Sequence, residues 1–494
     1  MAPARATPAR ALAHHGWLPL AALAATVAIE QGEKQSLSQA VDGIQHQFHV
    51  SDTAIGVLPF AMALVGVVGA FPFGVLADRR RRTALLAAGV LAWTVCMGAN
   101  AIATSYALLF VARMGVGTLE GNSPAAVSLL ADYYPVEDRA KNMGIYQSGA
   151  LAGALVGLIG GGVAVGAGGW RWAFLMWVPI GVAVAVFVRR QPEPRRGEQD
   201  LAFADREASA SLDVTDGAAA VEAVVSLGPL AATVEPPARR LPPPRRVGTL
   251  RYGTASSRSV LRELLRIRSM WFGVMSLTIS QLLLNGLQFW GVPYFKRVHH
   301  LGAAEAGAVT GLLGLGSVVG ILGGGVLADR LLRRGILNAR VFVVAFGSMA
   351  ATAVMLPAFL STSLVVTAPL LFVGGALLTL PVAPAEALVS DVVVAELRGR
   401  AATIRSVVRS ASNVGPLLIG GLSTFLIAHA ALGSADGLRL AIVALTPLYA
   451  IGGLVMLLAA RTYPSDIAFV LAESKRLRDG NVEVPGSQRG EAGS

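Results

Sequence analysis

Long apolar segments separated by short polar turns dominate this chain and limit the folds that it can adopt. Charged residues make up only 14% of the 494 residues and apolar residues 54%, whereas ordinary soluble domains are about 25% charged. Each segment has the roughly 20 residues that a helix needs to cross a bilayer core. We predict an all-α polytopic membrane protein with twelve transmembrane helices, at residues 17–43, 52–77, 83–104, 106–131, 142–166, 170–189, 269–296, 305–329, 338–360, 364–390, 401–428 and 437–461.

Two signals occur twice, in the same order. The sequence Gly-Val-Leu-Ala-Asp-Arg stands at 74–79 and again at 325–330, each time between the second and third span of a six-span half. A second set of charged residues has the same spacing in both halves. Its members are Asp132, Glu137, Arg139 and Lys141 in the first half and Asp391, Glu396, Arg398 and Arg400 in the second. Two parallel halves of similar build are typical of many secondary transporters.

The repeat also predicts the domain organisation. We expect an N-terminal six-helix half at 1–190, a partly disordered cytoplasmic linker at 191–268, a C-terminal six-helix half at 269–462 and a cytoplasmic tail at 463–494. The end of the linker, 259–269, alternates apolar residues with arginines at helical spacing. It is therefore either a helix on the inner leaflet or an extension of the seventh span. Residues 464–479 are expected to form another short surface helix.

The basic residues give the orientation. Lys and Arg gather in alternate short loops, and the positive-inside bias makes those loops cytoplasmic. We expect an integral protein of a bacterial inner membrane with both termini in the cytoplasm. The net charge of +11 comes from these cytoplasmic loops and does not indicate nucleic-acid binding. The first segment could mimic a cleaved signal, but a second span follows within a few residues. The single cysteine, Cys96, forms no intrachain disulfide, and we expect no metal or cofactor.

Charged residues inside the first and fourth spans are the strongest site candidates, because such charges are costly in a bilayer and usually functional. The first span carries Glu30, Glu33 and Lys34, and the fourth carries Arg113 and Glu120. At about 1.5 Å per residue, Glu120 matches the depth of Glu30, and Arg113 that of Glu33 and Lys34. We expect Arg113 within ion-pair reach of Glu33 or Glu30. The acids are proton-coupling candidates and the cations substrate-binding candidates. A purely structural salt bridge, or a first helix that has already left the membrane at Glu30, is the alternative.

Polar residues also form a stripe on the seventh span, at helical spacing. The stripe either bonds neighbouring helices or lines a substrate path. We take it as substrate-binding, and its members are Gln281, Asn285 and Gln288, followed by Trp290 and Tyr294.

Gating candidates lie nearer the cytoplasmic ends of the spans. Glu386 and Arg405, with Arg409, either snorkel or form an inner gate. The repeated loops supply further gating candidates, which are Asp78 and Arg79 in the first copy and Asp329 and Arg330 in the second.

The layout and the two Gly-x-x-x-Asp-Arg loops resemble the major facilitator superfamily. Residues 113–120, with Pro124 and 130–135, resemble its Spinster-like branch, as does the segment 169–174. The resemblance implies a proton-linked or gradient-driven carrier of lysophospholipids or sphingoid phosphates. It places the branch's fourth-span Arg and Glu on Arg113 and Glu120, and its first-span Asp-Arg pair on Glu33-Lys34. In the first-span pair, Glu replaces the branch's Asp and Lys replaces its Arg. In the fourth span, Leu119-Glu120-Gly121 stands where the branch usually has Gly-Glu-Ala.

Together these features predict a secondary active transporter that moves a lysophospholipid-like amphiphile by alternating access, coupled to protons. We expect a monomer whose partners are this amphiphile, protons and the bilayer. We do not expect an enzyme, because no metal-ligand cluster, nucleophile elbow or phosphate loop is visible. The alternatives are a proton-coupled multidrug or small-solute antiporter and, in a different class, a non-transporting membrane sensor or receptor.

Overall fold

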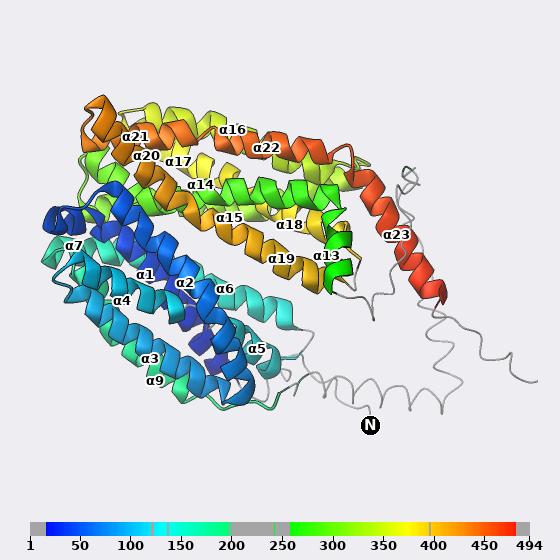
Figure 1. The fold of residues 1–494 in the computed structure, drawn as a ribbon, viewed down its shortest axis with the longest axis horizontal. Coiled ribbons are helices and arrows are strands. Elements are labelled where there is room, and N and C mark those ends of the chain that lie inside the picture. The colour runs from blue at the N-terminus through cyan, green and yellow to red at the C-terminus, as the bar shows by residue number, and fades with distance from the viewer. Residues whose placement is uncertain are drawn as a thin grey trace, which may run out of the picture. The chain divides into compact units, whose positions relative to one another are not determined.

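The computed structural model describes residues 16–119, 123–135, 138–196, 199, 242, 257–394 and 397–480, and these residues form helices joined by short turns (Figure 1). The first half contains α1 (Leu18–Phe48), α2 (Asp52–Arg79), α3 (Arg82–Ala101), α4 (Tyr106–Leu119), α5 (Ser123–Tyr133), α6 (Arg139–Leu155), a π-helical turn (Val156–Gly160), α7 (Gly161–Gly168), α8 (Trp172–Leu175) and α9 (Trp177–Arg189). The second half contains α13 (Ser257–Leu265), α14 (Arg268–Val298), α15 (Ala303–Arg333), α16 (Ala339–Leu360), α17 (Leu364–Thr379), α18 (Val382–Asp391), α19 (Arg398–Ser410), a 3₁₀ turn (Ala411–Val414), α20 (Gly415–Ala430), α21 (Ser434–Leu445), α22 (Leu448–Ala459) and α23 (Tyr463–Gly480).

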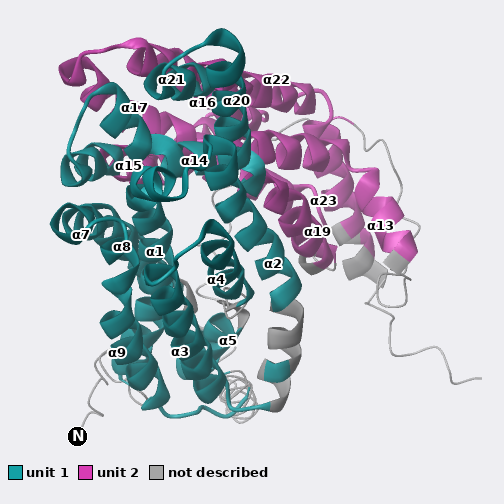
Figure 2. Cartoon of the chain, turned by 60° about the vertical axis from the view of Figure 1, so that its left-hand side comes forward, with its two compact units in different colours: residues 1–234, 285–311, 413–442 teal, residues 235–284, 312–412, 443–494 magenta. Residues whose placement is uncertain are grey.

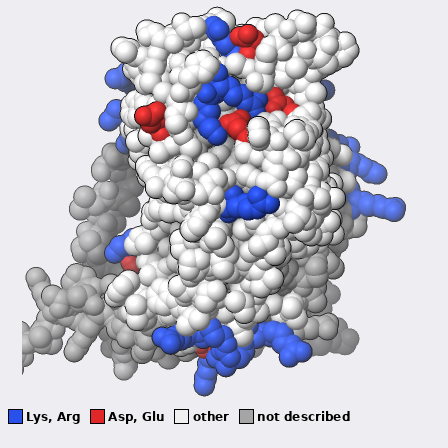
Figure 3. Space-filling model, turned by 90° about the vertical axis from the view of Figure 1, so that its left-hand side faces the viewer, with Lys and Arg blue, Asp and Glu red and all other residues white. Residues whose placement is uncertain are grey.

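The helices confirm the predicted fold class. Among the described residues, 10 helical stretches are long and apolar enough to cross a membrane. The two other predicted spans differ from these in composition or continuity. Helix α1 has 31 residues but carries several charges, and the predicted span 106–131 consists of α4 and α5 with residues 120–122 outside the described part. Most of the face shown in Figure 3 is uncharged, and its charged atoms lie in small groups.

Packing divides the chain into two compact units that cut across the sequence halves (Figure 2). The first unit joins residues 1–234 to 285–311 and 413–442, and the second contains 235–284, 312–412 and 443–494. One end of α14, the start of α15 and all of α20 therefore pack with the first-half helices. The predicted domain boundaries follow sequence rather than packing and stay a prediction. Most of the predicted linker lies outside the described residues.

Helix α1 of the first unit packs so closely against α6 and the π-helical turn that follows it that the backbones touch. A Cβ atom added at Gly149, Gly153 or Gly157 would overlap a carbonyl oxygen of α1. The three oxygens belong to Ala24, Ala28 and Gly32. Glycines repeated at this spacing let two membrane helices pack without side chains between them. The position of α1 along its axis is therefore set by α6.

The core of the second unit includes one face of α13. Val260, Leu264 and Ile267 are buried among side chains of α14, α16, α18 and α23. Helix α13 ends at Leu265 and α14 starts at Arg268, and Figure 1 shows α13 running at a steep angle to α14. The segment is thus a separate helix, and the expected alternative of an extended seventh span is wrong. The tail helix that we expected at 464–479 is confirmed as α23.

Candidate functional site

A fully buried ion pair joins α1 to α4. Arg113 donates from Nη1 to Glu33, and both side chains are 0% exposed. The Arg113 guanidinium also lies over the Phe174 ring, 5.0 Å from its centroid. Among the described residues, Nε and Nη2 of Arg113 and one oxygen of Glu33 have no hydrogen-bond partner. The pairing predicted from the matched depths is confirmed, and the buried groups have spare bonding capacity for a proton or a ligand.

Lys34, the next residue along α1, serves a different contact. Its Nζ lies 3.0 Å from Glu30, one helical turn earlier, and its side chain lines a cavity. Successive residues of a helix point about 100° apart, so α1 directs one charge into the protein core and its neighbour toward the cavity. Glu120, the second acid of the matched set, lies outside the described residues, and its role stays a prediction.

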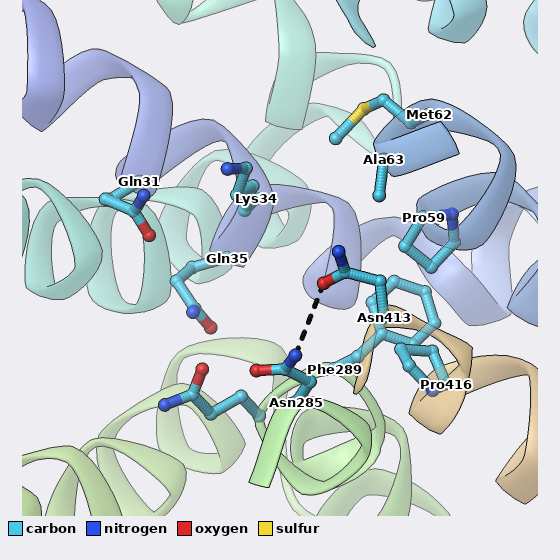
Figure 4. A pocket seen from close by; sticks show the side chains of 11 residues that line it. Gln31, Lys34, Gln35, Pro59, Met62, Ala63, Asn285, Phe289, Asn413 and Pro416 are labelled. Atoms are coloured by element: carbon cyan, nitrogen blue, oxygen red, sulfur yellow. Dashed lines mark hydrogen bonds between the residues drawn. The ribbon is translucent and has the colours of Figure 1, made fainter. Parts of the chain in front are cut away.

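The cavity has a volume of ≈ 240 Å³ and lies wholly within the first unit (Figure 4). Among the described residues, Lys34 is its one charged lining residue. The other polar groups are carboxamides, and the Asn285 amide donates to Asn413 across 3.3 Å. The remaining walls are apolar. The lining consists of Gln31, Lys34 and Gln35 of α1, Pro59, Met62 and Ala63 of α2, Asn285, Gln288 and Phe289 of α14, and Asn413 and Pro416 at the start of α20.

The polar stripe predicted on the seventh span divides into three groups. Asn285 and Gln288 line the cavity, whereas Gln281 belongs to the other unit. Trp290 and Tyr294 are fully buried, and the Trp290 indole donates to the Pro416 carbonyl oxygen at 2.8 Å. They do not line the cavity in this conformation, because they project about 140° and 180° round the helix from Asn285.

A second ionic network at one end of the first unit escaped the sequence analysis. Arg297 of α14 binds Asp42 of α1 at 3.0 Å and Asp52 of α2 at 3.0 Å. Lys296 adds a 2.7 Å contact to Asp42, and Ser423 of α20 donates to Asp52 at 2.6 Å. The network fastens helices of both sequence halves together. The available signal was that these charges stand at span ends on the side where the loops are nearly uncharged.

The first copy of the repeated signature forms a buried cluster around Arg82, the first residue of α3. Arg82 pairs with Asp132 at the end of α5 and, at 3.2 Å, with Glu193 just after α9. Burial opposes ionisation of Glu193, but hydrogen bonds from Thr83 and Arg82 outweigh it and lower the pKa of this carboxyl group. The side chains of the predicted gating residues Asp78 and Arg79 lie outside the described part of the structure.

The second copy forms a similar cluster around Arg340, near the start of α16. Arg340 pairs with Asp391, which accepts a 2.6 Å hydrogen bond from the Tyr463 hydroxyl. Asp329 of the repeated loop lies 4.0 Å from Arg340, and Arg330 is exposed. Neither Arg82 nor Arg340 was predicted from sequence, although the aspartates that they bind were found through the repeat.

The predicted pair of Glu386 and Arg405 also forms. Glu386 of α18 binds Arg405 and, at 2.8 Å, Arg409, both of α19. All three residues belong to the second unit. Their contact is therefore internal to that unit, and a gating role stays a prediction.

Membrane-length helices, a repeated architecture and a polar cavity between first-half and second-half helices are the features of a polytopic carrier. The chain belongs to the Major Facilitator Superfamily, which it matches over residues 23–416. It is an integral membrane protein.

Several relatives carry the Spinster name, which confirms the resemblance seen in the sequence. The chain is 30% identical over 165 residues to a sphingosine-1-phosphate transporter of Danio rerio, covering 32% of each chain. It is 31% identical to spinster homolog 3 of Mus musculus, covering 31% of each, and 29% identical to a hexuronate transporter of Bacillus subtilis (strain 168), covering 33% of this chain and 39% of the other. The matched part thus spans about a third of these relatives.

Solved structures support the fold over nearly the whole chain. A bacterial homolog of the lysosomal transporter Spinster, in an inward-facing and unoccupied conformation, superposes with a TM-score of 0.71 at 20% identity, covering 94% of this chain and 99% of the other. A D-xylose-proton symporter gives a TM-score of 0.61 at 17% identity, covering 92% and 99%. At such identities the likeness defines the fold alone.

Proposed function

We propose that the protein is a secondary active transporter that moves a lysophospholipid-like amphiphile with an anionic head, by proton-coupled alternating access. The observation that carries this proposal is the cavity around Lys34. The Lys34 ammonium in the lining suits a phosphate or carboxylate, and the surrounding carboxamides suit glycerol or sugar hydroxyls. Phe289 and Met62 offer an apolar wall for the start of a chain.

An exchange of partners would couple the ligand to protons. In this structure, Lys34 binds Glu30 at 3.0 Å. A ligand anion that takes over Lys34 would leave Glu30, a proton-coupling candidate, without its cation. Glu33 and Arg113 form a second such pair one residue away. Protonation of Glu33 would free a buried guanidinium, and this uncompensated charge favours a different helix arrangement.

The Arg297 network would act as the closure at one end of the transport path. Its acids come from α1 and α2 and its cations from α14, so it ties the two sequence halves together. Opening at this end requires Arg297 to leave both Asp42 and Asp52. Discrete repacking of interface salt bridges is a common element of such transitions.

A second candidate is a small anionic solute such as a sugar acid. The cavity volume of ≈ 240 Å³ lies below the roughly 300–1,000 Å³ of pockets that hold drug-sized ligands. A hexuronate transporter is also among the similar proteins. Both candidates share the anion that Lys34 would bind, and they differ in whether a chain must be accommodated.

Uptake into proteoliposomes distinguishes these candidates. A lysophosphatidylglycerol should be transported and should be displaced poorly by glucuronate or by cationic drugs. Lys34→Gln should weaken binding roughly tenfold or more, since charge-assisted hydrogen bonds contribute about 1.5–3 kcal/mol, whereas the exposed Lys141→Gln should not. Transport of glucuronate alone would replace the amphiphile with the small solute, and a cationic drug as the only cargo would contradict both.

Proton coupling has its own test. Glu33→Gln and Glu120→Gln should fold, bind ligand and lose the pH dependence of uptake. Full pH-dependent uptake by both well-expressed variants would remove these acids from the mechanism while leaving the cavity assignment intact.

A further inference from the structure

Helix α13 carries an exposed face that its own unit does not cover. While Val260 and Leu264 are buried, Leu261 and Leu265 are exposed to the surroundings. Arginines occupy the same exposed surface. They are Arg258, Arg262, Arg266 and Arg268. A helix with one face in the core and a second face of leucine and arginine is suited to the boundary between lipid headgroups and acyl chains.

A hollow of ≈ 390 Å³ lies beside this face, where α13 meets α14. It is lined by Leu265, Arg268, Trp271 and Phe272. The Trp271 indole N–H is already bonded to the Leu264 carbonyl oxygen at 3.0 Å. Its ring therefore offers the hollow an apolar surface and no donor. Three apolar side chains with one guanidinium match an acyl chain attached to an anionic group.

The local charge selects the sign of the headgroup. Between residues 257 and 272 the chain has four arginines and one acid, Glu263. Glu263 is mostly covered and lies 3.7 Å from Arg266, so little negative charge remains at the surface. Basic residues beside a membrane attract anionic lipids with about 1 kcal/mol each, and tryptophan favours the same interfacial depth.

We propose that this surface is a binding site for one anionic phospholipid of the bilayer leaflet on the linker side, separate from the transport cavity. The phosphate lies at Arg268, an acyl chain occupies the hollow between Leu265, Trp271 and Phe272, and the arginines of α13 face the headgroup layer. All of these residues belong to the second unit, whereas Lys34 and its cavity belong to the first. The bound lipid is a structural or regulatory ligand rather than cargo.

Fluorescence of Trp271 reports on the hollow directly. The full-length protein is placed in phosphatidylcholine nanodiscs with increasing fractions of brominated-chain phosphatidylglycerol or brominated-chain phosphatidylcholine, which quench a tryptophan that they touch. Subtracting the Trp271→Phe variant removes the signal of the other tryptophans. We expect half-quenching of Trp271 at a lower fraction of phosphatidylglycerol than of phosphatidylcholine.

Matched variants separate the charge from the hollow. Arg262→Gln with Arg268→Gln should raise the half-quenching fraction of phosphatidylglycerol roughly 30-fold, or until it equals that of phosphatidylcholine. The control, Arg189→Gln with Arg190→Gln, makes the same charge change at exposed positions and should leave it unchanged. Leu265→Phe keeps every charge but narrows the hollow, and should also weaken quenching.

Four results would overturn the proposed site. Equal quenching by the two lipids would show that the site does not select anionic lipid. An equal effect of the control pair would show that only the overall charge matters. No effect of Leu265→Phe would show that the acyl chain does not occupy the hollow. A shift of the half-quenching point by Lys34→Gln would place the lipid in the transport cavity instead, and would also contradict the proposal.

Discussion

The two clusters around Arg82 and Arg340 occupy corresponding places in the two halves and differ in burial. Each arginine stands at or next to the start of the third span and binds an aspartate at the end of the fourth. The third partner also comes from an equivalent place, just beyond the last span of its half. It is a carboxylate, Glu193, in the first half and a hydroxyl, Tyr463, in the second.

The difference in burial changes what each cluster contributes. The side chains of Arg82 and Asp132 are 4% and 9% exposed, whereas those of Arg340 and Asp391 are 15% and 32% exposed. Water screens the second pair, and such pairs add little stability. Removal of one partner from the first leaves a buried charge uncompensated. The two clusters therefore share the arrangement of their partners but differ in how much their ion pairs contribute to stability.

The largest expected effect comes from removing Arg82, and removal of Arg340 is its counterpart in the second half. Arg82→Gln should lower the free energy of unfolding by about 3–5 kcal/mol, because Asp132 stays buried without its cation, and Arg340→Gln by about 1 kcal/mol. Denaturant unfolding of the purified variants in one detergent measures both. Equal losses of unfolding free energy in the two variants would show that the difference in side-chain exposure does not change how much each cluster contributes to stability.

A smaller effect is expected from Asp132→Asn. Arg82 keeps Glu193 at 3.2 Å, so the loss should be about 2 kcal/mol, the scale of one hydrogen bond to a charged group. The same unfolding measurement applies, with Asp391→Asn as the counterpart in the second half. If Asp132→Asn costs as much as Arg82→Gln, Glu193 does not compensate Arg82.

Glu193→Gln sharpens the comparison through its pH dependence. The pKa of Glu193 is lowered by hydrogen bonds from Thr83 and Arg82, against the effect of burial. A lowered carboxyl pKa gives stability that is complete above the unfolded-state value and is lost as the pH falls through the folded-state value. The thermal stability of wild type should thus exceed that of Glu193→Gln at neutral pH and converge with it in acid. A difference that stays constant with pH would contradict this assignment.

The smallest effect is expected from Tyr463→Phe, which removes one hydrogen bond to Asp391. Because Asp391 is 32% exposed, water can replace this bond, and the loss should be about 1 kcal/mol or less. Burial raises the pKa of Tyr463 to about 12, although Arg340 acts in the opposite direction. A raised phenol pKa gives stability that is complete below the unfolded-state value of about 10 and is lost as the pH rises through the folded-state value. In denaturant unfolding, the stability advantage of wild type over Tyr463→Phe should therefore shrink as the pH rises between these two values. Stability curves of the two proteins that stay parallel with pH would contradict this role of Tyr463.

The contacts that sequence predicted are those fixed by one helix or by the repeat. The constant rise of a helix placed Arg113 at the depth of Glu33, and the pair forms. The repeat identified Asp132 and Asp391 together. It did not identify Arg82, because α2 ends at Arg79, Arg80 and Arg81 form an extended turn, and the path of this turn decides which arginine meets Asp132.

Contacts between distant segments lay beyond the sequence. Arg297 and Asp42 are joined only after α14 has packed against α1. Trp290 and Tyr294 were assigned to the cavity by their position after the polar stripe. In the structure their large side chains are buried in the core, on the opposite side of the helix. The cavity itself depends on Asn413, whose place follows from the 3₁₀ turn between α19 and α20 rather than from any motif.

The glycine contact between α6 and α1 has a consequence for anyone who wishes to redesign selectivity. Gln31 and Gln35 border open space and can be exchanged for other side chains without disturbing a neighbour's backbone. Gly153 and Gly157 face carbonyl oxygens of α1 and admit no larger residue. Even an alanine there would force a shift of α1 and displace the groups that it contributes to the cavity lining. The choice of residues on one helix of the cavity is thus limited by two glycines on a neighbouring helical segment that is not part of the cavity lining.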